Sequence, residues 1–138
     1  MVLDASVMIA WLINEPHLAL GDDIYQLLAE RTIHVPAHWP AEIANAMAVN
    51  IRKGRIRLAD FAAIDQRLCK LDVIVEPAPT LERIKLLVQF ATEYRLTAYD
   101  AAYVLLAHNS GVTLATIDGE MRKAAQQLSI PLLPTAAP

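Results

Sequence analysis

Short apolar segments that alternate with longer helical patterns constrain the fold of this chain most strongly. Five segments are predicted as buried strands, the last of them the weakest: Met1–Asp4, Thr32–Val35, Asp72–Glu76, Val112–Thr116 and Ile130–Leu133. Each interval between two successive strands carries a helical pattern. Strands that alternate with helices predict a parallel sheet with helices on both faces. The chain is therefore expected to belong to the α/β class.

The limits of the helices follow from residues that start and stop helices. Pro40 suits a first helical turn, where its missing N–H costs nothing. Gly54 and Gly111 fall where helices should end. Thr97 is a candidate N-cap, with Asp100 three residues later. The predicted helices are Ser6–Asn14, Leu20–Arg31, Pro40–Lys53, Leu58–Leu71, Thr80–Arg95, Thr97–Asn109 and Gly119–Leu128.

Length and composition limit the class of protein. A chain of 138 residues is expected to form one domain over residues 1–133, followed by a short flexible tail at 134–138. Residues of the set AVILMFWYC make up 55%, too many for a disordered chain, yet the longest unbroken apolar runs have only seven residues. A bilayer-spanning helix needs about 20, so no membrane role is expected. The single cysteine, Cys69, suits a reducing cytoplasm.

Three acidic residues are expected at one edge of the predicted sheet. Parallel α/β sheets bind ligands beyond the carboxyl ends of their strands. Asp4 ends the first strand, and Asp118 lies two residues past the fourth. Glu42 falls in the first turn of the helix that leaves the second strand, and such a helix begins at this edge. The sequence therefore brings three carboxylates toward the same place.

Asp100 is expected to join them by a longer route. Its helix reaches the fourth strand through only Ser110 and Gly111, so that helix should end near the opposite edge of the sheet. At about 1.5 Å per residue, its first turn then lies back at the edge that holds the other acids. Converging carboxylates repel one another unless a cation neutralises them. A set of oxygen ligands favours Mg²⁺ or Mn²⁺ over zinc.

Each of these acids also has a purely structural interpretation. Asp100 fits a capping box with Thr97, and Asp118 fits the N-cap of the helix that starts at Gly119. Glu42 suits the positive end of its helix dipole. Asp4 is the hardest of the four to explain structurally, because it interrupts an apolar run, where a buried unpaired charge is costly. We therefore favour one shared metal site over four unrelated structural acids.

Basic residues cluster in one place although the chain as a whole is acidic. The formal net charge is −3, but four of the twelve lysines and arginines fall within six positions: Arg52, Lys53, Arg55 and Arg57. The cluster is a candidate contact for a nucleic-acid backbone. Its structural alternative is a helix end that the dipole favours. His34 and His38 lie on either side of Pro36, so they are not expected to share a helix face as zinc ligands.

Four short motifs around the same acids resemble those of the PIN-domain family. They are Val2-Leu-Asp-Ala-Ser-Val7, Pro40-Ala-Glu-Ile-Ala-Asn-Ala46, Leu96-Thr-Ala-Tyr-Asp-Ala-Ala-Tyr-Val-Leu-Leu-Ala107 and Leu114-Ala-Thr-Ile-Asp118. Their order, their spacing and the length of the chain are similar to those of compact VapC-type toxins. Each motif is short, but together they cover nearly the whole chain.

The resemblance implies one PIN-like domain with a five-stranded parallel sheet in the order 3-2-1-4-5 and about seven helices. It also implies a cytoplasmic, metal-dependent endoribonuclease in which a metal-activated water attacks RNA phosphodiester bonds. The expected partners are a small antitoxin that silences the toxin and a second copy of the chain in a homodimer. By residue matching, Asp4, Glu42, Asp100 and Asp118 are the catalytic and metal-binding acids. Ser6, Asn45 and Thr116 line the site as supporting or substrate contacts.

Two other classes of protein are alternatives for the same residues. A phosphoacceptor receiver domain also gathers acids around Mg²⁺, but it requires two adjacent acids early in the chain and a lysine late. Here Asp4 has no acidic neighbour, and the late strand segment has no lysine. A non-catalytic partner-binding module is the third class, and four intact acids argue against it.

Overall fold

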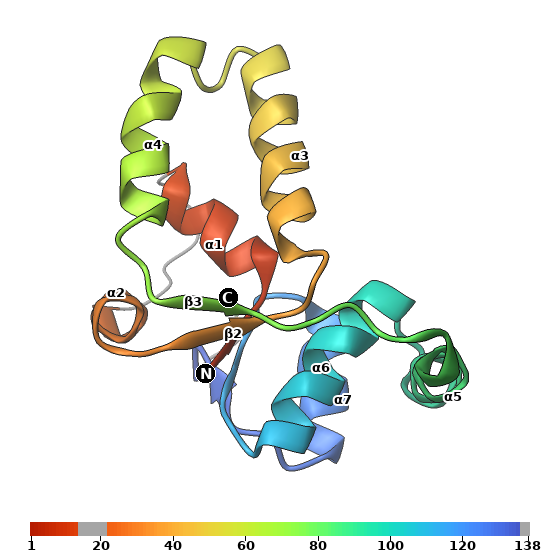
Figure 1. Cartoon of the computed structure of the whole chain (residues 1–138). Coiled ribbons are helices and arrows are strands. Elements are labelled where there is room, and N and C mark those ends of the chain that lie inside the picture. The colour runs from red at the N-terminus through yellow and green to blue at the C-terminus, as the bar shows by residue number, and fades with distance from the viewer. Residues whose placement is uncertain (14–21, 136–138) are drawn as a thin grey trace.

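Five parallel strands form the centre of the computed structural model, which describes residues 1–13 and 22–135. Their order across the sheet is β3-β2-β1-β4-β5, as predicted. Each observed strand lies inside its predicted segment: β1 is Val2–Leu3, β2 is Ile33–Val35, β3 is Val73–Val75, β4 is Leu114–Ala115 and β5 is Leu132–Leu133. Figure 1 shows the whole chain, in which β2 and β3 cross the middle of the molecule.

Seven α-helices lie within the described ranges, in agreement with the predicted number. They are α1 (Ala5–Leu12), α2 (Asp22–Glu30), α3 (Trp39–Arg52), α4 (Phe61–Leu68), α5 (Ile84–Tyr94), α6 (Ala98–Ser110) and α7 (Gly119–Gln127). Short 3₁₀ turns at Leu58–Asp60 and Leu81–Arg83 precede α4 and α5. Asn14 and Leu20, at the ends of two predicted helices, and residues 136–138 of the predicted tail lie outside the described residues.

The residues predicted to start and stop helices do so. Pro40 lies in the first turn of α3. The Thr97 hydroxyl accepts a hydrogen bond from the Asp100 backbone N–H at 3.1 Å and caps α6. Gly111 ends α6 with φ of 62°, in the left-handed region that glycine adopts without steric cost. These local signals set where α3 and α6 begin and where α6 ends.

The strands are only two or three residues long. Because neighbouring strands are parallel and paired, their carboxyl ends lie side by side at one edge of the sheet. In β1, Val2 is paired with Leu114 and Leu3 with Ala115, while Val2 also faces His34 of β2. The Asp4 backbone N–H donates to the Ala115 carbonyl at 2.9 Å. The chain turns from β1 into α1 at Asp4, which places this residue at the carboxyl edge of the central strand.

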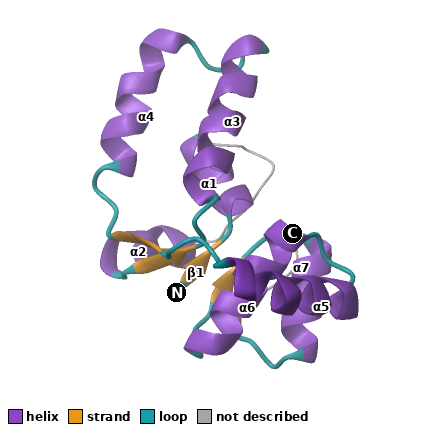
Figure 2. Ribbon diagram, turned by 45° about the vertical axis from the view of Figure 1, so that its right-hand side comes forward, coloured by secondary structure: helices purple, strands orange, loops and turns teal. Residues whose placement is uncertain are grey.

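Helices cover the two faces of the sheet unequally. In Figure 1, α1, α3 and α4 lie above the sheet, and α6 and α7 lie below it. Figure 2 shows α3 and α4 as two arms that extend well beyond the sheet, with α1 at their base. Helix α5 packs against α6 on the outside of the molecule. No helix within the described ranges is long and apolar enough to cross a membrane.

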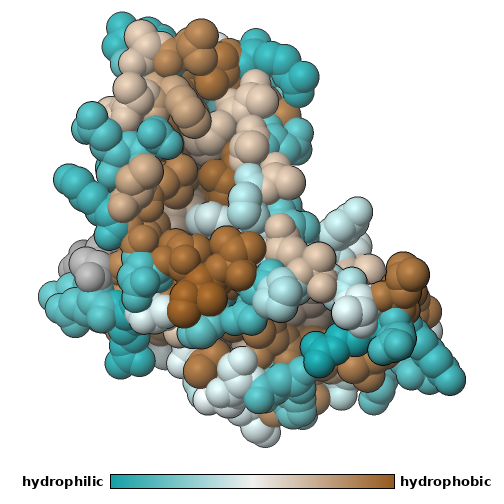
Figure 3. Space-filling model, in the orientation of Figure 1, coloured by the Kyte–Doolittle hydropathy of each residue, from teal (hydrophilic) through white to brown (hydrophobic). Residues whose placement is uncertain are grey.

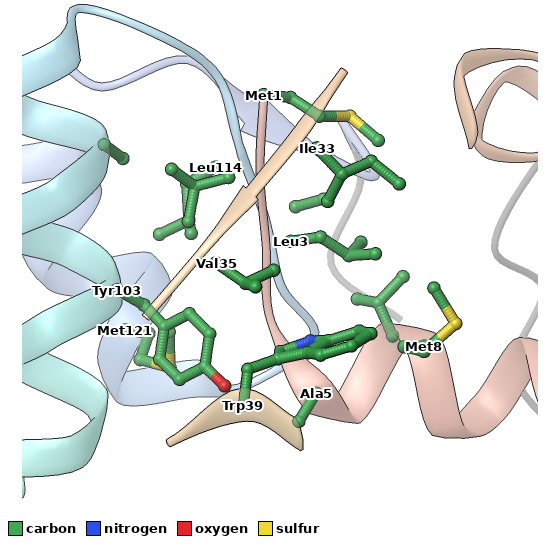
Figure 4. Packing of buried hydrophobic residues seen from close by; sticks show 14 of the residues in the cluster. Met1, Leu3, Ala5, Met8, Ile33, Val35, Trp39, Tyr103, Leu114 and Met121 are labelled. Atoms are coloured by element: carbon green, nitrogen blue, oxygen red, sulfur yellow. The ribbon is translucent and has the colours of Figure 1, made fainter. Parts of the chain in front are cut away.

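The core lies where the central strands meet the helices of both faces. Val2, Leu3, Leu114 and Ala115 are fully buried. Figure 4 shows the surrounding cluster, in which Tyr103 of α6 and Trp39 of α3 lie next to each other at one end of the core. Burying one large apolar side chain on folding contributes about 1.5–3 kcal/mol to stability. The core therefore holds β1, and with it Asp4, in a fixed place.

Candidate active site

Asp4 is buried at the carboxyl edge of β1, with 7% of its surface exposed. Its Oδ2 atom accepts hydrogen bonds from two hydroxyl groups, those of Ser6 and Thr116. The Thr116 Oγ1 atom lies 2.8 Å from this oxygen and comes from the residue directly after β4. Two of the three residues predicted to line the site thus contact Asp4 directly.

Burial raises the pKa of Asp4 above its ordinary value. The hydrogen bonds from Ser6 and Thr116 favour the carboxylate and oppose this shift, while the nearby charge of Glu42 adds to it. The cost of placing the charge in a poorly solvated position outweighs the hydrogen bonds. The protein therefore holds an ionised Asp4 only at the expense of stability, unless a positive charge binds beside it.

Glu42 lies in the first turn of α3, close enough to Asp4 for their charges to interact. Its Oε2 atom accepts a hydrogen bond from the Tyr103 hydroxyl. Tyr103 is almost fully buried, and burial followed by this hydrogen bond raises the pKa of its phenol. The tyrosine therefore stays protonated and donates its hydroxyl hydrogen to Glu42, which orients the Glu42 carboxylate.

No lysine or arginine within the described residues lies within 4.0 Å of Asp4 or Glu42. His38 comes nearest, with its Nε2 atom 3.7 Å from Glu42 Oε2. Two interacting carboxylates without a lysine or arginine partner favour the binding of a cation. Oxygen atoms of carboxylates are the ligands that Mg²⁺ and Mn²⁺ prefer. The residues present at this edge therefore fit a hard divalent cation.

Asp100 and Asp118 are placed differently, because both are engaged at the start of a helix. Asp118 Oδ1 accepts hydrogen bonds from the backbone N–H groups of Glu120, at 2.9 Å, and Met121, at 2.8 Å, and so caps α7. Asp100 Oδ2 accepts a hydrogen bond from the Thr97 hydroxyl at 2.6 Å. Asp118 is thus the N-cap of its helix, as predicted. Asp100 is joined to its N-cap Thr97, although its carboxylate accepts from the Thr97 hydroxyl and not from the backbone N–H of a capping box.

Thr116 links Asp118 to Asp4. Its hydroxyl donates to Asp4 and accepts a hydrogen bond from the Asp118 backbone N–H at 3.1 Å. The turn that carries both residues is held by Arg122, a buried arginine whose guanidinium donates to the carbonyls of Thr116, at 3.0 Å, and Pro134, at 2.9 Å. The position of Asp118 is thus coupled to that of Asp4 although their carboxylates have different partners.

Within the described residues, no three side chains of the His, Cys, Asp and Glu types come close enough together to form a metal-binding group. Asp4 and Glu42 interact, whereas Asp100 and Asp118 are engaged with their own helices. Asn45, one turn after Glu42 on α3, is exposed and has no side-chain hydrogen bond among those residues. The shared role of all four acids stays a prediction.

Two residues near Glu42 were not predicted as site residues, Tyr103 and His38. Tyr103 follows Asp100 by three positions in α6, a spacing that places both side chains on one helix face. This spacing is a usable signal for Tyr103. His38 directly precedes α3 and packs its ring against Tyr103, with ring centroids 5.2 Å apart, which the sequence does not indicate.

The predicted basic cluster lies at the tip of the hairpin formed by α3 and α4. All four side chains are exposed. Arg57 is engaged by Asp60 through two hydrogen bonds of 2.7 Å each. The Asn50 carbonyl accepts backbone hydrogen bonds from Arg55 and Ile56, which closes the turn at the tip. Arg52, Lys53 and Arg55 have no acidic side chain within 4.0 Å in the described part of the chain.

Comparison with known proteins assigns this fold to a family. The family described as PIN domain matches residues 1–127. The VapC ribonuclease Mb0985 of Mycobacterium bovis is 32% identical over 135 residues, which cover 96% of this chain and 98% of that protein. Ribonuclease VapC12 of Mycobacterium tuberculosis is 30% identical over 130 residues, or 89% of this chain and 90% of that protein.

A solved structure agrees in fold. The crystal structure of PAE2754 from Pyrobaculum aerophilum superposes with a TM-score of 0.67 and 24% sequence identity, covering 89% of this chain and 82% of that one. These matches leave no support for a receiver domain. The parallel sheet, the placement of the acids and the matches over almost the whole length together lead to one assignment: the chain belongs to the PIN-domain family, among the VapC ribonucleases.

Proposed function

We propose that this chain is a metal-dependent endoribonuclease that cleaves RNA phosphodiester bonds and acts as the toxin of a toxin–antitoxin pair. The observation that carries the proposal is the buried Asp4 beside Glu42, with no lysine or arginine near them in the described residues. The relatives that match almost the full length of the chain are named ribonucleases, which supports RNA as the substrate.

The four acids Asp4, Glu42, Asp100 and Asp118 would hold Mg²⁺ or Mn²⁺. When bound, such an ion polarises a phosphate oxygen and activates water for attack on phosphorus. Ser6 and Thr116 orient the Asp4 carboxylate through hydrogen bonds to Oδ2. Tyr103 orients Glu42 in the same way. Asn45, exposed one turn beyond Glu42, is placed to contact substrate.

The basic cluster supplies the attraction for the RNA backbone that the acidic site lacks. Arg52 is ten residues beyond Glu42 on the same helix, so the cluster begins about 15 Å from the site along the helix axis. Arg57 is neutralised by Asp60, so Arg52, Lys53 and Arg55 are the cations available to phosphates. We assign these three residues the main role in backbone binding.

Two surfaces suit the expected protein partners. Figure 3 shows the surface hollowed between the α3 and α4 arms, with apolar side chains on either side, and Trp11 of α1 lies near the base of these arms under Arg67. We assign this hollow to a small antitoxin, whose arginine could neutralise the acidic site. Exposed Leu81, Ile84 and Val88 near and along α5 suit a homodimer. The lone Cys69 supports a cytoplasmic location.

The test is cleavage of RNA by the purified chain, free of antitoxin, with Mg²⁺ or Mn²⁺ and with EDTA. We expect cleavage only with metal, and a loss of at least about 100-fold for Asp4→Asn, since even partners of metal ligands contribute 10–100-fold. Matched circular dichroism spectra would show that the variant is folded. Unchanged cleavage in EDTA, or a fully active Asp4→Asn protein, would contradict the proposal. A strictly monomeric protein at micromolar concentration would contradict the homodimer.

A further inference from the structure

Tyr99 exposes an aromatic ring directly beside the candidate active site. It is the second residue of α6, immediately before Asp100, and 65% of its surface is exposed. Exposed apolar side chains are common and need no explanation when they are scattered. Tyr99 is different because its ring belongs to a continuous row of aromatic side chains.

The row runs from solvent to the Glu42 carboxylate. The Tyr99 ring packs edge to face against His38, with centroids 5.2 Å apart and an angle of 65° between the rings. His38 packs in the same way against Tyr103, at 5.2 Å and 85°. The Tyr103 hydroxyl donates to Glu42. Two ring contacts and one hydrogen bond therefore connect Tyr99 to the Glu42 carboxylate.

His38 adds rigidity to this row. Its Nε2 atom is buried and has no hydrogen-bond partner within the described residues, and it lies 3.7 Å from Glu42 Oε2. The ring is therefore held by packing between the two tyrosines rather than by hydrogen bonds. The exposed Tyr99 ring is packed against His38 and is therefore pre-organised, so a flat ligand that stacks on it does not have to order it first.

We propose that Tyr99 is a stacking platform for one base of single-stranded RNA, next to the phosphate that is cleaved. The inference rests on the proposed ribonuclease function and adds a base contact to it. The acids and their cation hold only the phosphate, and the basic cluster holds only the backbone. A base that stacks on Tyr99 places the adjacent phosphate at the acids, and stacking accepts any base because every base has an aromatic face.

The experiment uses a short single-stranded RNA whose cleavage position has first been mapped with the parent protein. Tyr99→Ala and Tyr99→Phe are compared with the parent in Mg²⁺, and KM and kcat are measured separately. Loss of one base stack is expected to raise KM by about 5- to 150-fold in Tyr99→Ala. Tyr99→Phe keeps the ring and should behave as the parent does. Gln127→Ala, which truncates an exposed side chain at the last residue of α7, should leave KM unchanged.

A second substrate series separates stacking from a general effect on the fold. The same RNA is made with an abasic ribose at each position that flanks the cut. At one position the missing base should weaken binding to the parent as much as Tyr99→Ala does, and it should add nothing in Tyr99→Ala, because the two partners form one contact. A purely structural role of Tyr99 would give the same abasic penalty in both proteins.

The outcomes distinguish this inference from the proposed function. A parent protein that cuts no RNA with either metal would overturn both. A parent that cuts RNA while Tyr99→Ala has the same KM, or shows the same abasic penalty, would overturn the stacking platform alone. A change of oligomeric state in Tyr99→Ala, with RNA affinity unchanged, would assign the ring to a protein interface instead.

Discussion

The four acids predicted for this site fall into two pairs that the fold holds in different ways. The inner pair, Asp4 and Glu42, lies where β1 ends and α3 begins, and its carboxylates interact with hydroxyl groups and with each other. The capping pair, Asp100 and Asp118, lies at the starts of α6 and α7, where hydrogen bonds from the first turn or its N-cap residue satisfy each carboxylate.

The difference shows what burial does to a negative charge. A capping carboxylate faces the positive end of a helix and stabilises the fold by itself. A buried carboxylate beside another one destabilises the fold until a cation binds. Acidic side chains therefore stabilise their own helices in the capping pair, whereas in the inner pair we expect them to be costly until a cation binds. Each of the following experiments asks whether that division holds.

The largest effect is expected for metal-dependent stability. Mg²⁺ or Mn²⁺ that binds only the folded protein should stabilise it by about 2.7 kcal/mol at a concentration of 100 times Kd. Asp4→Asn should remove most of this gain and leave the metal-free protein at least as stable as the parent, because the costly buried charge is gone. Thermal melting with a metal titration and with EDTA measures both quantities.

The pH dependence of the metal-free protein is the control for this variant. Because the pKa of Asp4 is raised in the fold, its contribution to stability is present below the unfolded value near 3.8 and is lost as the pH rises through the folded pKa. Asp4→Asn should therefore reduce the loss of stability between pH 4 and neutral pH. An identical pH profile in parent and variant would show that Asp4 carries no such cost.

An intermediate effect, on RNA binding, is expected at the basic cluster. Its side chains are exposed, so the comparison extends to charges that are not buried. Replacing Arg52, Lys53 and Arg55 with glutamine should weaken RNA binding and reduce the dependence of log K on log salt by about 0.7 per lost phosphate contact. Arg57→Gln is the matched control and should change little, since Asp60 already neutralises Arg57. An unchanged salt slope in the triple variant would remove the cluster from the RNA path.

The smallest effect is expected at Asp118, where two substitutions separate its cap from its charge. Asp118→Ala removes the acceptor for two backbone N–H groups and should cost about 1 kcal/mol, with or without metal. Asp118→Asn keeps a good capping residue and should cost little in EDTA. If Asp118 also holds the ion, Asp118→Asn will reduce the gain from metal. A full metal gain in Asp118→Asn would restrict Asp118 to its cap.

Much of the fold was predictable because local sequence patterns determine its helices and strands. Apolar segments of strand length, Pro40 in the first turn of α3, and Gly111 at the end of α6 each act over a few residues. The strand order, however, came from the resemblance rather than from those patterns. Asp4 could be predicted as a site residue because a buried charge inside an apolar run is costly.

The sequence alone determined which elements form, placed their ends to within a few residues, and predicted which acids approach one edge of the sheet. Only the tertiary structure decided how each acid is held, since that depends on side chains far apart in the chain. Thr116 reaches Asp4 across 112 positions, and Tyr103 reaches Glu42 across 61. Burial and such long-range hydrogen bonds set the energy of each carboxylate, and no local pattern records them.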